Sequence, residues 1–302
     1  MIRADFKFNS QLLLAPVEVK AALPYSLIEM APPQGRGWRT LWLFHCAFAD
    51  AGIFFESLGA SALCDKYSLA LIAPSLPNSF FRDQGPRRNA AFVGGELIPA
   101  LQQLLPLSKA REDNAAFGIS MGAYGALCLA LEQPQLFGRV FAVSGYYEPA
   151  LPDDPRLDKE RRQKNILKIA RPWLNDLHGG PQGERNAVAT LTEQAAARGI
   201  SLLPQLDFSC GSEDYLSQCQ TEYVRTLLEH AGIASSFTLL PEEGHDEECW
   251  SKALRQCAAD FGSAALWRRA ECSACAQGTD SSKLRRHSAK QSAPACPSLT
   301  TS

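Results

Sequence analysis

The sequence predicts an α/β protein built on a mainly parallel, doubly wound sheet with helices on both faces. Short apolar runs alternate along the chain with segments of helical periodicity, and strands joined through helices pair in parallel. Residues 41–44 are apolar at every position, as a central strand must be when helices cover each side. A serine between two glycines, at 118–122, separates another apolar run from a helix-forming run. Such a sheet has its ligand site at the carboxyl ends of the strands.

The expected strands are short apolar runs bounded by turn residues, at 12–23, 38–44, 68–73, 115–119, 140–144, 202–209 and 237–240. Residues 90–105 have the periodicity of an amphipathic helix, which Pro106 ends. The helix-forming run 126–131 follows the serine. Each of the last two strands is followed by an acidic loop and then by a helix.

The chain is expected to contain one catalytic domain over residues 1–268, with a cap-like insertion at about 148–200. The insertion is rich in proline and charge, with two expected helices at 158–170 and 185–198. Residues 271–302 hold two large aliphatic side chains, Leu284 and Leu299, so we expect a disordered tail over 269–302. Cysteine and histidine spacings in this tail match no zinc pattern well, and no metal site is expected.

Composition restricts the class of partner. The formal charge of −2, from 30 basic and 32 acidic residues, supplies no field for nucleic acid or an anionic membrane. Charges interrupt the N-terminal segment, and no later window approaches the roughly 20 apolar residues of a membrane span. We therefore expect a soluble, cytoplasmic protein whose ten cysteines are reduced thiols. The expected partner is a small molecule, and the oligomeric state is left open.

Ser120 is the first candidate for catalysis. Gly118 to Gly122 match the G-x-S-x-G turn, which lifts a serine hydroxyl above the end of a sheet. Glycine suits positions 118 and 122 because side chains two residues either side of the serine would collide across the turn. The following helix directs its N-terminal amides to the same place, where an anion would be stabilised. The pattern predicts a nucleophilic serine.

A serine nucleophile needs a base, and His245 is the expected one. It lies directly after the last predicted strand and before a helix, so its loop can bring the imidazole over Ser120. The other histidines lie before the serine, in the cap, at the end of an amphipathic helix and in the tail: His45, His178, His230 and His287.

The orienting acid is expected in the loop after the preceding strand. Asp207 lies inside that strand, whereas Glu213 and Asp214 follow its Gly211 turn. Asp214 has the shorter reach that suits a fixed hydrogen bond to imidazole, and Glu213 has an alternative role as an exposed helix cap. Spacing alone leaves the choice between these two residues open.

Three blocks of the sequence, at 118–122, at 210–216 and at 244–246 followed by Trp250, resemble the active-site blocks of the esterase D and tributyrin-esterase group of serine α/β-hydrolases. The group includes S-formylglutathione hydrolases and feruloyl or acetylxylan esterases, and the resemblance covers about residues 10–265. It implies a single α/β-hydrolase domain without metal or organic cofactor. It also implies that Ser120 is the nucleophile, Asp214 the acid and His245 the base.

The same resemblance implies an oxyanion hole made by the backbone amides of Ala47 and Met121. The chain departs from the family pattern at Cys46, where a small residue is usual, and at Ala123, where a second glycine is common. The Cys46 side chain is expected to change the width or angle of the oxyanion loop.

Aromatic residues are the candidates for the substrate pocket. Residues 78–83 resemble the family's aromatic segment at the pocket mouth, which implies that Phe80 and Phe81 line the pocket. Phe48 is a further candidate for the pocket. The alternative is that the two aromatics of this segment pack beneath a loop.

We expect a serine esterase that hydrolyses short-chain carboxylic esters through an acyl-enzyme intermediate. The alternatives are a thioesterase of the S-formylglutathione hydrolase type, an acyltransferase that excludes water, and a non-catalytic binding protein of the same fold. Fold alone does not separate the esterase, the thioesterase and the acyltransferase.

Overall fold

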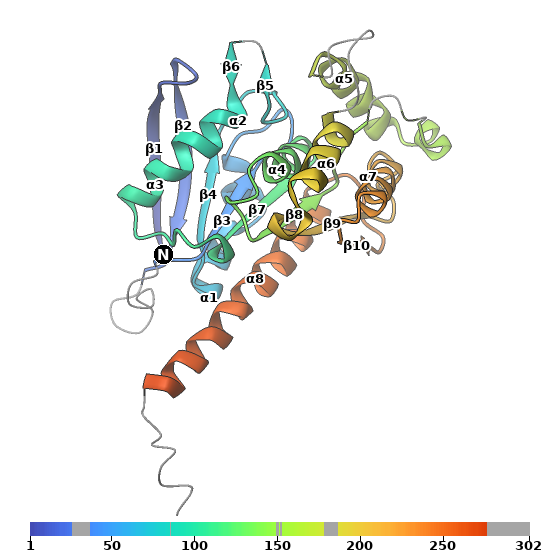
Figure 1. The fold of residues 1–302 in the computed structure, drawn as a ribbon. Coiled ribbons are helices and arrows are strands. Elements are labelled where there is room, and N and C mark those ends of the chain that lie inside the picture. Colours follow the sequence, from blue (N-terminus) through green and yellow to red (C-terminus); the bar gives the residue numbers. More distant parts are fainter. Residues whose placement is uncertain (26–36, 85, 149–150, 152, 178–186, 277–302) are drawn as a thin grey trace, which may run out of the picture. The chain divides into compact units, whose positions relative to one another are not determined.

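The computed structural model describes residues 1–25, 37–84, 86–148, 151, 153–177 and 187–276 (Figure 1). Met1–Ser263 forms one structural unit, and Ala264–Ser302 forms a second. The first unit contains the sheet and every candidate site residue. The expected tail begins inside the last helix, α8 (Glu247–Ala276), and its residues 277–302 lie outside the described part of the chain, as does His178.

An eight-stranded sheet organises the first unit, with the strand order β1-β2-β4-β3-β7-β8-β9-β10. The pairs from β4 to β10 are parallel, and β2 is antiparallel to both β1 and β4. The strands are β1 (Ile2–Ser10), β2 (Ala15–Leu23), β3 (Thr40–Phe44), β4 (Ala70–Pro74), β7 (Asn114–Ile119), β8 (Arg139–Val143), β9 (Gln205–Gly211) and β10 (Ser235–Leu240). The predicted α/β-hydrolase fold is confirmed.

Helices cover both faces of the sheet because its central strands are apolar on both sides. In β3, Trp42 and Phe44 join one core cluster, and Leu41 and Leu43 join the other. The first cluster also receives α3 (Ile98–Leu104), α4 (Met121–Glu132), α6 (Ala187–Arg198) and α7 (Gln218–His230). The second receives α1 (Ala60–Tyr67) and α8 (Figure 1). Successive side chains of a strand point to opposite faces, which explains this division.

Most expected elements occur within a few residues of their predicted places, with three differences. The chain begins with strand β1, where we expected none, and residues 12–14 form a turn before β2. The helix expected at 90–105 is present without a break, but its middle is π-helical: α2 (Asn89–Ala91) continues into η2 (Phe92–Leu97) and then into α3. Residue 202 belongs to the 3₁₀ turn η6 (Ile200–Leu202) rather than to β9.

The insertion between β8 and β9 contains η4 (Pro155–Asp158), α5 (Arg161–Leu177) and α6. We call residues 148–200 the cap. The remaining short elements are η1 (Ile53–Ser57), η3 (Arg111–Asp113) and the hairpin of β5 (Asp83–Gln84) with β6 (Arg87–Arg88).

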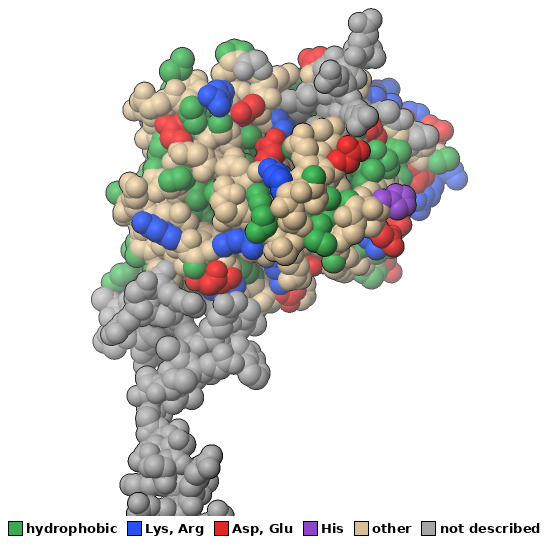
Figure 2. All heavy atoms as spheres, viewed as in Figure 1, with side chains coloured by type: hydrophobic (Ala, Val, Ile, Leu, Met, Phe, Trp, Pro, Cys, Tyr) green, Lys and Arg blue, Asp and Glu red, His purple; other side chains and the backbone are tan. Residues whose placement is uncertain are grey.

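The surface carries charges of both signs. Acidic and basic side chains are interspersed on the face that Figure 2 presents. Among the described residues, no helix combines the length and the apolar composition that crossing a membrane requires.

Candidate active site

Ser120 lies at the sharp turn between β7 and α4. Its backbone has φ +53° and ψ −112°, a conformation that is costly for a side chain and marks functional sites. The flanking glycines make the turn sterically feasible. A Cβ atom on Gly118 would overlap the Gly122 carbonyl, and one on Gly122 would overlap the Phe44 carbonyl. The steric reason inferred from the sequence therefore holds in the structure.

His245 meets Ser120 from the loop after β10. Its Nε2 atom is 3.1 Å from Ser120 Oγ, and its Nδ1 atom is 3.0 Å from Asp214 Oδ2. The imidazole is 4% exposed, and the indole of Trp250 packs edge-to-face on it at 5.3 Å. Ser217 Oγ is a further polar neighbour, at 3.3 Å from Nδ1. The ring is thus fixed on three sides, with one nitrogen toward the serine and the other toward a carboxylate.

The structure distinguishes the two candidate acids. Asp214 is fully buried, with both carboxylate oxygens near the imidazole, and its Oδ1 atom also accepts a hydrogen bond from the Ser217 amide at 3.1 Å. Glu213 is exposed and makes no such contact through its side chain. The Glu213 amide instead donates to the Glu243 carbonyl at 2.8 Å, which joins the acid loop to the loop that carries His245.

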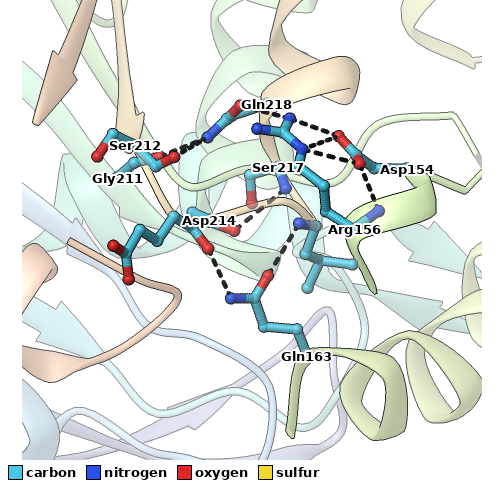
Figure 3. A network of polar contacts seen from close by, with 10 residues as sticks. Asp154, Arg156, Gln163, Gly211, Ser212, Asp214, Ser217 and Gln218 are labelled. Carbon is cyan, nitrogen blue, oxygen red and sulfur yellow. Dashed lines mark hydrogen bonds and ion pairs between the residues drawn. The ribbon is translucent and has the colours of Figure 1, made fainter. Parts of the chain in front are cut away.

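The cap holds the acid loop through one buried glutamine. Gln163 on α5 donates from Nε2 to the Glu213 carbonyl at 2.8 Å and accepts from the Leu216 amide at 3.0 Å (Figure 3). These two hydrogen bonds lie on either side of Asp214 in the sequence. No sequence pattern predicts this contact, because a glutamine on a basic amphipathic helix ordinarily faces water.

A second polar link lies beside the first. Arg156 of η4 pairs with Asp154 and donates to Gln218 Oε1 at 3.0 Å (Figure 3). The side-chain Nε2 of Gln218 donates in turn to the backbone carbonyls of Gly211 and Ser212, at 3.1 and 2.7 Å. The cap therefore contacts the acid loop on both sides of its turn.

The proposed oxyanion amides belong to Ala47, in the loop after β3, and Met121, at the first position of α4. Neither amide donates to another group in the part of the chain that the structure describes. A buried histidine supports this loop. The Leu76 amide donates to His45 Nε2 at 3.1 Å, so the ring proton resides on Nδ1, which donates to the Cys46 carbonyl at 2.7 Å. Burial lowers the pKa of His45, which is consistent with a neutral ring.

A pocket of about 300 Å³ opens beside Ser120 and His245. The oxyanion loop, the start of α8 and the cap line it, through Cys46, Ala47, Phe48, Ala49, Ile53, Arg162, Ile166, Glu247 and Trp250. Phe48 is 61% exposed and packs against Trp173 of the cap at 5.2 Å. Burial raises the pKa of Cys46 to about 12, so this thiol is a neutral part of the wall.

The expectation that Phe80 and Phe81 line the pocket is corrected. They are 2% and 1% exposed and pack edge-to-face on Tyr124 and Phe44. Both have positive φ angles, +50° and +54°, which turn the rings inward beneath their loop. They are core residues, as the alternative interpretation held.

A second, larger hollow of about 670 Å³ lies at the start of β9 and β10. Its wall is mostly apolar, with Asp207 as the one carboxylate among its described lining residues. The chemistry-bearing residues converge on the smaller pocket, which is therefore the candidate site.

Comparison with known proteins identifies the family of the chain. The family described as "Putative esterase" matches residues 81–261, which include Ser120, Asp214 and His245. The chain belongs to this esterase family. An acetyl esterase of Caldicellulosiruptor saccharolyticus is 28% identical over 262 residues, which cover 83% of this esterase and 94% of that one.

Solved structures share the fold of the esterase. The serine hydrolase FphF of Staphylococcus aureus superposes with a TM-score of 0.70 at 20% identity, over 86% of this chain and 98% of that one. The S-formylglutathione hydrolase FrmB of the same organism gives the same values. The esterase is a carboxylic ester hydrolase.

Proposed function

We propose that this esterase hydrolyses short-chain carboxylic esters through an acyl-enzyme intermediate on Ser120. The supporting observation is the continuous hydrogen-bond chain from Ser120 Oγ to His245 Nε2, at 3.1 Å, and from His245 Nδ1 to Asp214 Oδ2, at 3.0 Å. Asp214 accepts a hydrogen bond from Nδ1–H and so keeps the ring proton on that nitrogen, which leaves Nε2 free to take the proton of the serine hydroxyl. Asp214 then stabilises the imidazolium that forms.

The reaction has two stages with balanced proton transfers. Ser120 Oγ attacks the ester carbonyl as its proton moves to His245, and the tetrahedral intermediate collapses when His245 returns that proton to the departing alcohol. Water then loses a proton to His245 and attacks the acyl-enzyme, and the acid leaves as Ser120 regains its proton. The amides of Ala47 and Met121 are the proposed donors to the oxyanion in both stages.

The size of the pocket supports a short acyl group. About 300 Å³ is at the lower end of the range for small-molecule sites, and Trp250, Ile53 and Phe48 stand close to the nucleophile. We expect acetyl to butyryl esters to give the highest kcat/KM in a series of 4-nitrophenyl esters from acetate to palmitate. A maximum at octanoate or beyond would contradict the short-chain proposal.

A thioester of the S-formylglutathione kind is the second candidate. Its support is the fold shared with FrmB, together with a pocket mouth that is open enough to expose most of Phe48. The same serine, base and acid act on esters and thioesters. Assaying S-formylglutathione beside 4-nitrophenyl acetate under identical conditions ranks the two by kcat/KM.

Replacing the nucleophile tests the mechanism. Ser120→Ala is expected to lower kcat by about 10⁴-fold or more, because it removes the attacking atom and adds no bulk. A fluorophosphonate should label the wild type once, on Ser120, and should not label the variant. Labelling at another residue, or turnover by Ser120→Ala at the wild-type rate, would refute the proposal.

A pair of variants tests the acid. Asp214→Asn is expected to cut kcat by roughly 10⁴-fold, because an amide can donate to Nδ1 and so place the imidazole proton on the nitrogen that faces the serine. The matched control is Glu213→Gln, which changes the adjacent, exposed carboxylate. This variant should lower kcat by less than about twofold. The opposite ranking would show that the acid has been misassigned.

A further inference from the structure

The mouth of the active-site pocket carries an arginine that the hydrolytic mechanism does not use. Arg162 lines the same pocket as Ser120 and His245. Among the described residues, no carboxylate pairs with Arg162, whereas nearby Arg156 and Arg171 of the cap are paired with Asp154 and Asp153. A guanidinium that faces a reaction pocket without an internal partner is available to a ligand.

The backbone of this arginine is held in place through its neighbour on α5. Its neighbour Gln163 is buried and is held to the acid loop by two hydrogen bonds, at 2.8 and 3.0 Å. Ile166, four residues after Arg162, lines the pocket as well, so one face of α5 turns toward the nucleophile. Arg162 is therefore presented by a docked helix rather than by a free loop.

The charge of the whole helix favours an anionic ligand. The sequence of α5 contains five basic residues and one acidic residue, although the full chain has a formal charge of −2. Two of these basic residues are neutralised by carboxylates, Lys164 by Asp158 and Arg171 by Asp153. Of the other three, Arg161, Arg162 and Lys168, only Arg162 lines the pocket, so its charge is the one that acts on an anion there.

We propose that Arg162 binds a carboxylate on the substrate, so that the preferred esters carry a negative charge on their acyl or alcohol part. The planar guanidinium matches a carboxylate with two parallel hydrogen bonds. The carboxylate of Glu247 also lines the pocket and repels any anionic group of the substrate that lies beside it. This inference rests on the proposed esterase function and specifies its substrate class.

Matched substrates test the proposal. On the alcohol side, 4-acetoxybenzoate is compared with the neutral, isosteric 4-acetoxybenzamide, and on the acyl side, monoethyl adipate is compared with ethyl adipamate. Arg162→Gln is expected to lower the ratio of kcat/KM between charged and neutral partners by about 10-fold in at least one pair, mainly through KM, as loss of a charge-assisted contact requires. The affected pair identifies which part of the substrate carries the charge.

Arg161→Gln is the control, because Arg161 carries the same charge on the same helix but does not line the pocket. It should leave both ratios within twofold of wild type, and Glu247→Gln should raise the ratio for the charged partners. A ratio unchanged in Arg162→Gln for both pairs would overturn the proposal. Each neutral ester serves as an internal reference for folding and for the catalytic residues, so a general loss of esterase function would be recognised separately.

Discussion

At the scale of single residues, His45 supports the oxyanion loop only while it is neutral. Its Nε2 atom accepts from the Leu76 amide, and a proton on that nitrogen would face the amide proton. Burial lowers the pKa of folded His45, whereas the unfolded residue titrates near 6.5. As the pH falls below that value the unfolded chain binds the proton first, so the free energy of unfolding decreases.

We therefore predict that His45→Gln weakens the pH dependence of stability. Between pH 7.5 and 5.5 the wild type should lose up to about 1.4 kcal/mol through His45, and the variant should lack this contribution. Urea denaturation of both proteins at the two pH values measures it. Equal losses in the two proteins would show that folding does not lower the pKa of His45.

Gly122 is the residue whose substitution should most directly disturb the catalytic turn. A methyl group there would overlap the Phe44 carbonyl, at the end of β3 where the oxyanion loop begins. Gly122→Ala is expected to cost about 1–3 kcal/mol of stability and most of the activity. Gly95→Ala is the control, since a Cβ there meets no atom within 4 Å. Thermal unfolding and ester hydrolysis should show lower stability and lower activity for Gly122→Ala than for Gly95→Ala. A Gly122→Ala enzyme of wild-type activity would contradict the prediction.

At the scale of elements, the cap both lines the pocket and is hydrogen-bonded to the acid loop. Gln163→Ala removes both hydrogen bonds that flank Asp214. We expect kcat to fall about 10-fold with little change in KM for a neutral ester, because the acid loop loses its fixed position while the pocket lining remains.

Gln102→Ala provides the comparison for Gln163. Gln102 also lies on a helix and donates to a backbone carbonyl, that of Ser108 at 3.0 Å, but it does not line the pocket. A similar loss of stability in both variants, with loss of kcat in the Gln163 variant alone, supports a positioning role. Equal kcat values in the Gln163→Ala and Gln102→Ala variants would show that Gln163 has only a structural role.

The sequence predicted elements better than it predicted contacts between them. Apolar runs located the central strands, and the order of strand ends predicted Ser120, His245 and an acid at 213 or 214 at the same edge of the sheet. The resemblance to the esterase group, and not the spacing, selected Asp214. Strand β1 was not predicted although its residues alternate, because the charges of Arg3, Asp5 and Lys7 interrupt the apolar run that marks a buried strand. These side chains lie on the exposed face of an edge strand. The role of Gln163 depends on the docking of the cap, which no local pattern encodes.

At the scale of the whole molecule, α8 is anchored to the sheet well before its end. The guanidinium of Arg39, at the start of β3, lies 3.8 Å from the centre of the Phe261 ring, and it also pairs with Asp113 at 3.4 Å. Phe261 itself is buried in the second core cluster. The anchor depends on residues that precede 264.

Removing residues 271–302 is therefore expected to leave the melting temperature within about 2 °C of the full chain and the esterase activity unchanged. The removed segment contains few large aliphatic side chains, and the Arg39–Phe261 contact is retained. Calorimetry and a 4-nitrophenyl acetate assay on both proteins check this. A large drop in melting temperature would show that the segment packs against the catalytic unit.

The two hydrogen bonds of Gln163 also restrict how this enzyme can be re-engineered. A cap taken from another esterase would bring a different pocket wall, yet it would remove the groups that hold the Glu213 carbonyl and the Leu216 amide. Such a chimera should bind its new substrate and turn it over slowly until a side chain with both a donor and an acceptor is restored at position 163. A cap that changes the specificity therefore has to be introduced together with a residue at position 163 that preserves the contact with the acid loop.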